Sequence, residues 1–364
     1  MSRFCVVAGE EFIQNTAGGG NVFYANLLML SLLQKKVMVF FVARKKMISL
    51  EYSTEQLQQQ QPPIQKWQLP LRGGRFVKLG IKILLFLYLT VRFKWLIVEH
   101  FYALPSMNYA PRFVFRKLIY SQHDFLFKVK ALRDQTDKTS LKEVELKTIK
   151  QCKAAFAGNA KEAEFMNKQL GVSSIYLPIH TTKQPTTMED FDYSQTIYHL
   201  GSFKTTASKL GFEHYKQNIL PLLDKSKLTL KLIGGSTEQF SSIDDHVEGL
   251  GFVDDLSSLL WLGSIQIIPW RYDSGQRTRV FEAIARGNVM ISFKVLKEII
   301  PELEHKKNCM LVNTDQEFAS AIERLLDDQE LRKKLAIGAL ALNNCFSLET
   351  RVQKFKEFVE YLEK

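Results

Sequence analysis

The sequence predicts an α/β fold made of two doubly wound, Rossmann-like domains that face each other across a cleft. Short apolar and β-branched runs alternate with longer helical patterns along the chain, which is typical of parallel sheets. The chain has 364 residues and is 46% hydrophobic, enough for two domains that each bury a core. A stretch with many turn residues and little periodicity, 179–193, separates two such alternations. We therefore expect domains at 1–180 and 191–346, and a C-terminal helix at 347–364 that packs back toward the first domain.

The first half contains five expected strands, each a short apolar run that ends near glycine or polar residues. A helical pattern at 21–36 follows the first of them. Residues 55–70 are rich in Gln and Pro, so we interpret them as a surface excursion before the third strand. The strands are expected at 3–9, 37–43, 95–100, 117–124 and 154–159.

The second half repeats this alternation with six expected strands, and long helical patterns at 315–342 follow the last of them. The strands are expected at 196–203, 228–235, 246–252, 265–270, 289–293 and 309–313.

One apolar stretch, 79–91, could be mistaken for a membrane span. It contains Lys82, is flanked by Arg75, Lys78 and Arg92, and is too short to cross about 30 Å of hydrocarbon. Two interpretations stay open, namely a core-facing helix with a basic edge and a helix that also leans on acidic lipid head groups.

Charge is unevenly distributed along the chain. Residues 1–190 carry 27 Lys and Arg against 14 Asp and Glu, whereas residues 191–364 carry 22 against 24. The resulting +13 and −2 suggest that the first half meets an anionic surface, such as the inner face of a membrane. The basic residues are not interleaved with aromatics in a recognised module, which disfavours nucleic-acid binding.

The four cysteines are far apart and form no Cys-x-x-Cys pair, so neither a zinc site nor a redox pair is indicated. Few cysteines and an N-terminus that reads as a strand predict a cytoplasmic protein.

A glycine-rich segment after the first strand prompts a test for dinucleotide binding. A Gly-x-Gly-x-x-Gly pattern that starts at Gly18 needs glycine at position 23, where Phe23 stands. The second strand also ends in Arg44 and lysines, without the acid that a ribose needs, so NAD binding is strongly disfavoured. Gly18, Gly19 and Gly20 either let a ligand approach the backbone on the acceptor side or form a flexible turn without a ligand.

The sequence "RYDSGQRTRVFEAIARG", 271–287, places four arginines, a glycine turn and a glutamate after an expected strand. If Asp273 or Ser274 caps the next helix, the N–H groups that follow are free donors at its positive end. A diphosphate fits such a site, and an arginine adds a permanently charged fork. The residues concerned are Gly275, Gln276 and Arg277.

Glu282 lies further along the same expected helix. It either forms an i,i+4 ion pair with Arg286 or accepts two hydrogen bonds from the adjacent hydroxyls of a ribose.

The segment "DSGQRTRVFEAIARGNVMIS", 273–292, resembles the nucleotide-sugar signature of GT-B glycosyltransferases, specifically the retaining "group 1" (family 4-like) set. That pattern is a glycine turn, an Arg–x–Lys/Arg pair, Glu-Ala-x-Ala-x-Gly and a strand. The resemblance is strong over 195–350 and looser before residue 100. It implies the GT-B architecture and transfer of a sugar, with retention of configuration, from a UDP- or GDP-type nucleotide sugar to a cell-surface glycan or a lipid-linked acceptor. It implies no metal and no cofactor.

The resemblance also implies roles for residues that match the family's pattern. Glu282 would bind the donor ribose, and the backbone around Gly251, Phe252 and Val253 would face the base. Gly275, Gln276 and Arg277 would hold the diphosphate, with Lys204 or Lys209 reaching from the loop after Gly201 and Ser202. His100 would lie beside the reacting sugar carbon, and His123 and Asp124 would line the acceptor side. For both histidines, a polar residue at a strand end with a backbone partner is the alternative.

One departure from the family pattern opens two alternatives. Many relatives carry a second glutamate eight positions before the ribose glutamate, where this chain has Ser274 with Asp273 beside it. The chain is then either a transferase or a non-catalytic GT-B-like binding subunit that partners a true transferase. An inverting transferase with Asp124 as its general base is a third, weaker hypothesis.

Overall fold

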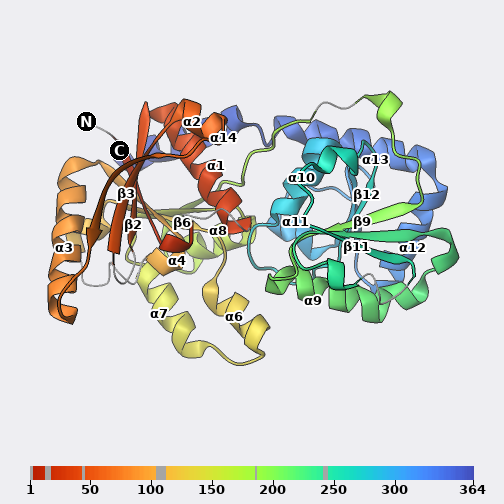
Figure 1. Ribbon diagram of the computed structural model, residues 1–364, viewed down its shortest axis with the longest axis horizontal. Helices are drawn as coiled ribbons and strands as arrows, with labels where there is room; N and C mark the ends of the chain where they lie inside the picture. Colours follow the sequence, from red (N-terminus) through yellow and green to blue (C-terminus); the bar gives the residue numbers. More distant parts are fainter. Residues whose placement is uncertain (1–2, 13–17, 43–45, 104–111, 185–186, 241–244) are drawn as a thin grey trace. The chain divides into compact units, whose positions relative to one another are not determined.

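The computed structural model describes residues 3–12, 18–42, 46–103, 112–184, 187–240 and 245–364. The chain forms two compact α/β units, each with its own sheet and its own helices (Figure 1). Unit 1 comprises Met1–Ile179, Ser274–Gln276 and Leu348–Lys364, and unit 2 comprises His180–Asp273 and Arg277–Ser347.

Unit 1 contains an eight-stranded sheet with the order β4-β3-β2-β1-β5-β6-β7-β8. Strands β2, β1, β5, β6, β7 and β8 pair with their neighbours in parallel. Strand β3 pairs with β2 in the antiparallel sense, and β4 pairs with β3 in the same way. The bounds are β1 (Phe4–Ala8), β2 (Lys36–Val42), β3 (Lys46–Ser53), β4 (Ile64–Pro70), β5 (Trp95–Glu99), β6 (Leu118–Gln122), β7 (Ala154–Ala157) and β8 (Ser173–Tyr176).

Three of these strands, β3, β4 and β8, correct the sequence interpretation. β4 occupies part of the stretch expected to be a surface excursion, and β3 and β8 were not expected at all. The buried positions of β3 alternate as a strand requires, but they include Ser49 and Glu51, so the usual apolar alternation is hidden. Glu51 is paired with Lys36 and Lys66, which explains how a carboxylate is accommodated there.

The helices of unit 1 cover both faces of its sheet, and the last one comes from the C-terminus of the chain. Its Phe355 ring packs against Phe4 and Phe156, with centroids 5.7 and 5.6 Å away. The helices are α1 (Gly18–Leu33), α2 (Thr54–Gln58), α3 (Arg75–Arg92), α4 (His100–Ala103), α5 (Arg112–Phe115), α6 (Leu126–Asp134), α7 (Thr139–Ile149), α8 (Ala160–Lys168) and α14 (Leu348–Glu363), with one 3-10 turn at Glu10–Phe12.

Unit 2 contains a six-stranded, wholly parallel sheet with the order β11-β10-β9-β12-β13-β14, the doubly wound arrangement expected from the sequence. All six strands expected in the second half are present, and several end earlier than the apolar runs. Their bounds are β9 (Thr196–Leu200), β10 (Thr229–Ile233), β11 (Val247–Gly251), β12 (Ile265–Ile268), β13 (Val289–Phe293) and β14 (Met310–Val312).

Helices again cover both faces of this sheet (Figure 1). The long helical pattern expected at 315–342 is divided at Asp328, whose carboxylate accepts from the Leu331 N–H and caps the second helix. The helices are α9 (Thr206–His214), α10 (Thr278–Arg286), α11 (Val295–Ile299), α12 (Asp315–Asp327) and α13 (Gln329–Ala341). A π-helical turn lies at Tyr215–Ile219, and 3-10 turns lie at Met188–Asp190, Leu220–Leu222, Lys225–Lys227, Glu238–Phe240, Leu256–Ser258 and Leu342–Asn344.

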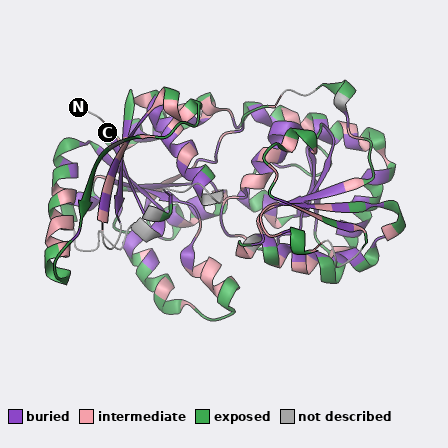
Figure 2. Ribbon diagram, viewed as in Figure 1, coloured by how far each residue is buried: buried purple, intermediate pink, exposed green. Residues whose placement is uncertain are grey.

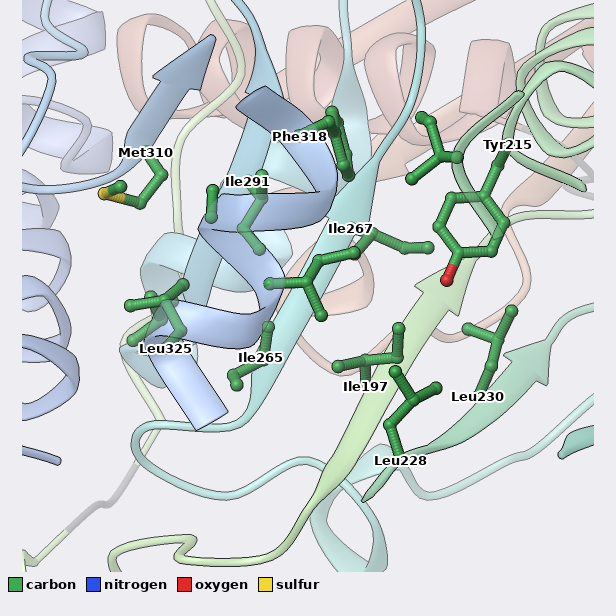
Figure 3. Packing of buried hydrophobic residues seen from close by; sticks show 14 of the residues in the cluster. Ile197, Tyr215, Leu228, Leu230, Ile265, Ile267, Ile291, Met310, Phe318 and Leu325 are labelled. Carbon is green, nitrogen blue, oxygen red and sulfur yellow. The ribbon is translucent and has the colours of Figure 1, made fainter. Parts of the chain in front are cut away.

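The core of unit 2 is packed from strand and helix side chains of similar size. Ile265, Ile267 and Ile291 project from the sheet toward Phe318 and Leu325 of α12 (Figure 3). The central strands of both sheets are buried and purple in Figure 2, whereas the edge strand β4 is largely exposed. Such sheets have rigid strand ends, and ligands of open α/β sheets collect at the carboxyl ends of the strands. The candidate residues of each unit lie at those ends.

Candidate functional site

In unit 1, two histidines follow neighbouring parallel strands and form crossed pairs with carboxylates. His100 directly follows β5, and its Nε2 lies 3.2 Å from Oδ1 of Asp124. His123 directly follows β6, and its Nε2 lies 2.8 Å from Oε2 of Glu99. The parallel register brings both strand ends to one edge of the sheet, so the structure places together His100, His123 and Asp124, the three candidate catalytic residues that the sequence singled out.

The two imidazole rings also contact each other and the same aromatic side chain. Their centroids lie 5.5 Å apart, and the Phe12 ring lies 5.3 Å from His123 and 6.4 Å from His100. Burial opposes protonation of His100, but the hydrogen bond and charge of Asp124 outweigh it, so the pKa of His100 is raised above its usual value. His100 also has a φ of 59°, a left-handed conformation that is uncommon outside glycine and is found at functional sites.

Glu99 is a site residue that the sequence interpretation missed. Its side chain is fully buried and accepts from both His123 and the Nδ2 of Asn26, at 2.8 Å in each case. Asn26 accepts in turn from Arg351 of the C-terminal helix. The acid within the apolar run "LIVEH" is a signal that could have found Glu99. Asn26 and Arg351 are far away in sequence and carry no such signal.

Two further buried carboxyl groups lie close to this edge of the sheet. Glu145 accepts from the N–H groups of Leu126 and Phe127 at the start of α6, and burial nevertheless raises its pKa to about 7. Burial likewise raises the pKa of Glu162 on α8 to about 8. Neither residue was predicted.

Glu162 overturns part of the expected diphosphate site. Its Oε1 accepts from the N–H of Gly275 at 3.0 Å, and Asn159 donates to the Gly275 carbonyl at 3.3 Å. The Gly275 N–H is therefore not a free donor. The same contacts tie Ser274–Gln276 to the rest of unit 1 and keep this backbone outside the following helix.

The start of the following helix is also corrected. α10 begins at Thr278, two residues later than expected, and its N-cap residue is Arg277, with no side-chain capping bond. Neither Asp273 nor Ser274 caps it, so the N–H groups of Gly275 and Gln276 lie outside its first turn. Gly18, Gly19 and Gly20 form the start of α1, and residues 13–17 before them lie outside the described residues.

In unit 2, three glycines end neighbouring strands. Gly201 follows β9 and Gly234 follows β10, with φ values of 147° and 139°, and Gly251 ends β11. A Cβ on Gly234 would lie 2.5 Å from the Gly201 carbonyl oxygen, so only glycine allows the two loops to pack this closely. Ser202 braces the same loops by donating to the Gly235 carbonyl at 3.3 Å.

A partly buried cation, Arg279, lies against these glycine loops. Its guanidinium donates to Ser208 Oγ at 2.8 Å and lies 3.5 Å from Nε2 of His199. A Cβ on Gly201 would lie 2.7 Å from Nη2 of Arg279. Burial and the charge of Arg279 lower the pKa of His199 well below its usual value, so this ring adds no second positive charge beside Arg279. Within the described residues no carboxylate forms an ion pair with Arg279, and burial lowers its pKa to about 10.

The other predicted donor-site residues lie apart from this cation. The Arg277 guanidinium lies over the Trp270 ring, 4.4 Å from its centroid. Glu282 accepts from Arg286 at 2.7 Å, so the i,i+4 pair exists in this structure. Lys204 is exposed, and Lys209 is exposed and faces Glu213. The two lysines that were expected to reach the diphosphate thus lie at the surface, whereas Arg279, which matches the second position of the Arg–x–Lys/Arg pair, lies against the glycine loops.

On the turn after β11, Phe252 is 76% exposed, whereas Val253 packs beside a small apolar cluster that includes Leu200 and Ile233. Phe252 is therefore available to a ligand at this end of the sheet.

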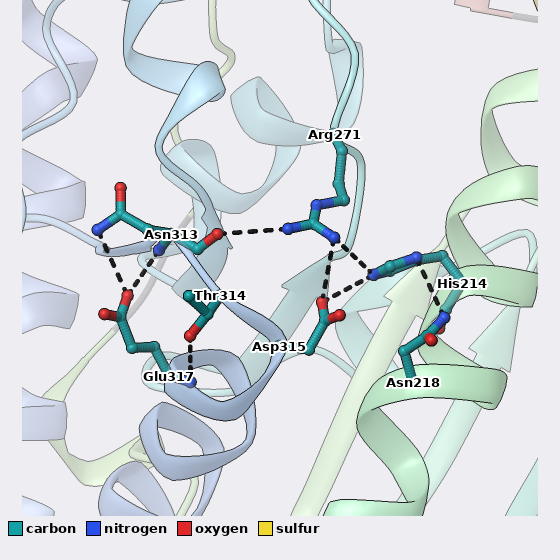
Figure 4. A network of polar contacts seen from close by, with 7 residues as sticks. All are labelled: His214, Asn218, Arg271, Asn313, Thr314, Asp315 and Glu317. Atoms are coloured by element: carbon teal, nitrogen blue, oxygen red, sulfur yellow. Dashed lines mark hydrogen bonds and ion pairs between the residues drawn. The ribbon is translucent and has the colours of Figure 1, made fainter.

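A polar network holds the start of the segment that joins β12 to α10 (Figure 4). The Arg271 guanidinium donates to the Asn313 carbonyl at 3.3 Å, and it lies 3.5 Å from both Asp315 and His214. His214 and Asp315 are themselves 2.8 Å apart. Arg271 is also stacked over Phe293, 4.3 Å from the ring centroid. Arg271, the third residue of the segment, is therefore fixed to α9, β13 and the β14–α12 turn.

The whole chain resembles several solved structures. HepE of Anabaena, solved in complex with UDP, is 15% identical, with a TM-score of 0.72, and the match covers 99% of this chain and 100% of that one. Sucrose-phosphate synthase of Thermosynechococcus elongatus is 13% identical, with a TM-score of 0.70 and 99% of both chains covered. A glycosyltransferase of Rickettsia africae is 12% identical, with a TM-score of 0.67 and both chains fully covered.

The two parallel-sheet units and these likenesses show that the fold is that of GT-B glycosyltransferases. Residues 194–328, which lie in unit 2, match the model of the group 1 glycosyl transferases. A search of curated proteins gave no match to the chain.

Proposed function

We propose that this protein is a retaining glycosyltransferase that moves a sugar from a nucleoside-diphosphate sugar to a cell-surface glycan or a lipid-linked acceptor. The match of unit 2 to group 1 glycosyl transferases supports the reaction class. HepE was solved with UDP and with UDP-glucose, which favours a UDP-type donor over a GDP-type donor here.

The observation that carries the proposal is the uncompensated charge of Arg279 beside the glycine loops of β9 and β10. An arginine fork recognises phosphate oxygens in pairs, and it is strengthened where water is partly excluded. Because no carboxylate in the described part of the chain pairs with Arg279, its charge is available to an anionic ligand. We therefore assign the diphosphate to Arg279, the first turn of α10 and the Gly201 loop, with Glu282 on the ribose and Phe252 near the base.

The histidine pair of unit 1 then serves the acceptor side. With retention, the leaving phosphate itself helps to deprotonate the acceptor, and His100 steadies developing charge beside the sugar carbon. His123 and Asp124 contact the acceptor. No metal or cofactor enters this proposal. The alternative function is a non-catalytic binding subunit, which would still bind a nucleotide but would transfer no sugar.

We further propose that unit 1 associates peripherally with anionic membranes on the cytoplasmic side, as an enzyme of polysaccharide biosynthesis would. Only Phe86, Leu89 and Thr90 are buried among the eighteen residues of α3. Its outward side exposes large apolar side chains, among them Phe76 at 86% and Val91 at 76%. Exposed apolar groups between basic residues are typical of helices that lie on acidic lipid surfaces. No helix in the described ranges is long and apolar enough to cross a membrane.

The test of the proposed donor site is the Arg279→Ala variant in calorimetric titrations with UDP. Loss of charge-assisted bonds should weaken binding by about 1.5–3 kcal/mol. Arg324→Ala removes an exposed arginine of the same unit, whose nearest carboxylate lies 3.9 Å away, and should leave the affinity unchanged. Equal affinities for wild type and Arg279→Ala would remove Arg279 from the site.

A further inference from the structure

A chain of buried polar contacts connects the C-terminal helix to His123. Arg351 of α14 donates to Oδ1 of Asn26 on α1, and Asn26 donates through Nδ2 to Oε1 of Glu99 at 2.8 Å. Glu99 accepts from His123 on its other oxygen. All four side chains are at most 6% exposed, and they come from four separate parts of unit 1.

The chemistry of the groups fixes the direction of each bond. A guanidinium only donates, so Asn26 must turn its carbonyl oxygen toward Arg351. The amide nitrogen then faces Glu99, and it also donates to Ser121 Oγ at 2.9 Å. A carboxylate only accepts, so Nε2 of His123 is the donor in its bond to Glu99. In the tautomer that carries its single proton on Nε2, the Nδ1 atom is an acceptor for a substrate hydroxyl.

We propose that Arg351 and Asn26 are positioning residues that hold His123, through Glu99, in one orientation and one tautomer for the acceptor. This inference rests on the proposed acceptor-side role of His123. The arrangement follows the logic of catalytic triads, in which a buried acid orients a histidine.

Packing of α14 alone does not account for Arg351. The helix already buries Phe355, Phe358 and Val359 in the core of unit 1. Within the described residues, the Nε and Nη1 atoms of Arg351 are buried without a hydrogen-bond partner. Burying a guanidinium in this way is unfavourable, whereas an apolar residue at this position would pack the helix without the free-energy cost of desolvating a charge. The positive charge of Arg351 interacts favourably with the negative charge of the Glu99 carboxylate.

The test compares Arg351→Met in the wild-type background and in the His123→Ala background. In the first, kcat should fall by about 10²-fold, less than the roughly 10⁴-fold loss when a triad acid is replaced, with donor KM unchanged. In the His123→Ala background the same substitution should have no further effect. Equal losses in both backgrounds would show that Arg351 acts only on stability and would overturn the proposal. Phe355→Leu, which loosens the same helix without touching the polar chain, should leave kcat near the wild-type value.

A second measurement does not depend on transferase activity. Ring ¹⁵N chemical shifts of His123 in the nucleotide-free protein should report the Nε2–H tautomer, and Asn26→Asp or Arg351→Met should change them to a mixture. Arg351→Lys, which keeps a donor, should restore part of the wild-type signal if Arg351→Met does not fold. Shifts that stay at wild-type values in the Arg351 and Asn26 variants would refute the inference. A protein with the predicted shifts but without transferase activity would instead refute the proposed function.

Discussion

His100 combines three properties at a single position. It ends a buried parallel strand, it adopts a left-handed backbone conformation, and its ring is held by Asp124. A left-handed non-glycine residue is destabilising by about 1–3 kcal/mol, so the surrounding contacts must maintain it. Such strain motivates a functional hypothesis for this residue in particular.

We therefore expect His100→Ala to lower turnover by about 10²–10⁴-fold, the range for a positioned catalytic side chain. Nucleotide affinity should change little, because the diphosphate and ribose are assigned to residues of unit 2. Steady-state kinetics and calorimetry on the same variant give both numbers. Full activity of the alanine variant would contradict a catalytic role and would leave His100 as a polar residue at a strand end.

Glu282 offers a test that separates its two interpretations. Glu282→Gln should weaken binding of a nucleoside diphosphate more than binding of inorganic diphosphate, because only the former carries ribose hydroxyls. The structure shows its ion pair with Arg286, so loss of that pair alone should affect both ligands equally. Competition titrations with UDP and diphosphate measure the difference.

Some contacts of individual side chains could be predicted from the sequence, and others could not. His100, His123 and Asp124 were predictable because strand ends in a parallel sheet share one edge. Arg279 matched the Arg–x–Lys/Arg pair but was given no role, and Lys204 or Lys209 was expected at the diphosphate, since a sequence does not tell which cation folds inward. The free N–H expected at Gly275 was wrong because its partner, Glu162, is 113 positions away in the chain.

At the element scale, helix α3 is the part of the first half whose surface is hardest to explain by packing within unit 1. Its exposed side chains include Leu84 at 67% and Tyr88 at 56%, in addition to the two apolar residues near its ends. Arg72, Arg75 and Arg92 are exposed beside them. Each basic residue near an anionic lipid surface contributes about 1 kcal/mol.

We expect the protein to sediment with phosphatidylglycerol vesicles at low salt and the Phe76→Ser/Val91→Ser double variant to do so several-fold less. Ile337→Ser, which alters a similarly exposed apolar residue of unit 2, is the matched control. Added salt should release the wild-type protein, because screening shortens the reach of its charges. Equal pelleting with neutral and anionic vesicles, or no effect of salt, would contradict the membrane proposal.

The elements themselves were predicted well wherever the strand is buried on both faces. In unit 2, β12, β13 and β14 are buried at every residue and read as largely apolar runs, which is the pattern that a parallel sheet produces. The antiparallel strands β3 and β4 were missed because Ser49 and Glu51 occupy buried positions and β4 is largely exposed. Strand β8 was missed because its four residues are only half-buried and include two serines.

At the scale of the whole molecule, two sheets of the same winding carry different chemistry at their carboxyl ends. Unit 1 presents paired histidines and carboxylates, whereas unit 2 presents glycine loops and an uncompensated arginine. This division matches the needs of a transferase, in which one unit binds an anionic nucleotide and the other handles an acceptor hydroxyl. The GT-B fold is compatible with it, but a fold alone does not establish a function.

The central claim is that unit 2 binds a nucleoside diphosphate, and a thermal-shift screen of nucleotides tests it most directly. A ligand that binds only the folded state must raise its stability, by about 2.7 kcal/mol at one hundred times its Kd. We predict that UDP or a UDP-sugar raises the Tm in a concentration-dependent manner in the wild-type protein, and that this rise is much reduced in Arg279→Ala. No rise with UDP, GDP or ADP and their sugar derivatives, in a protein that unfolds cooperatively, would contradict the account.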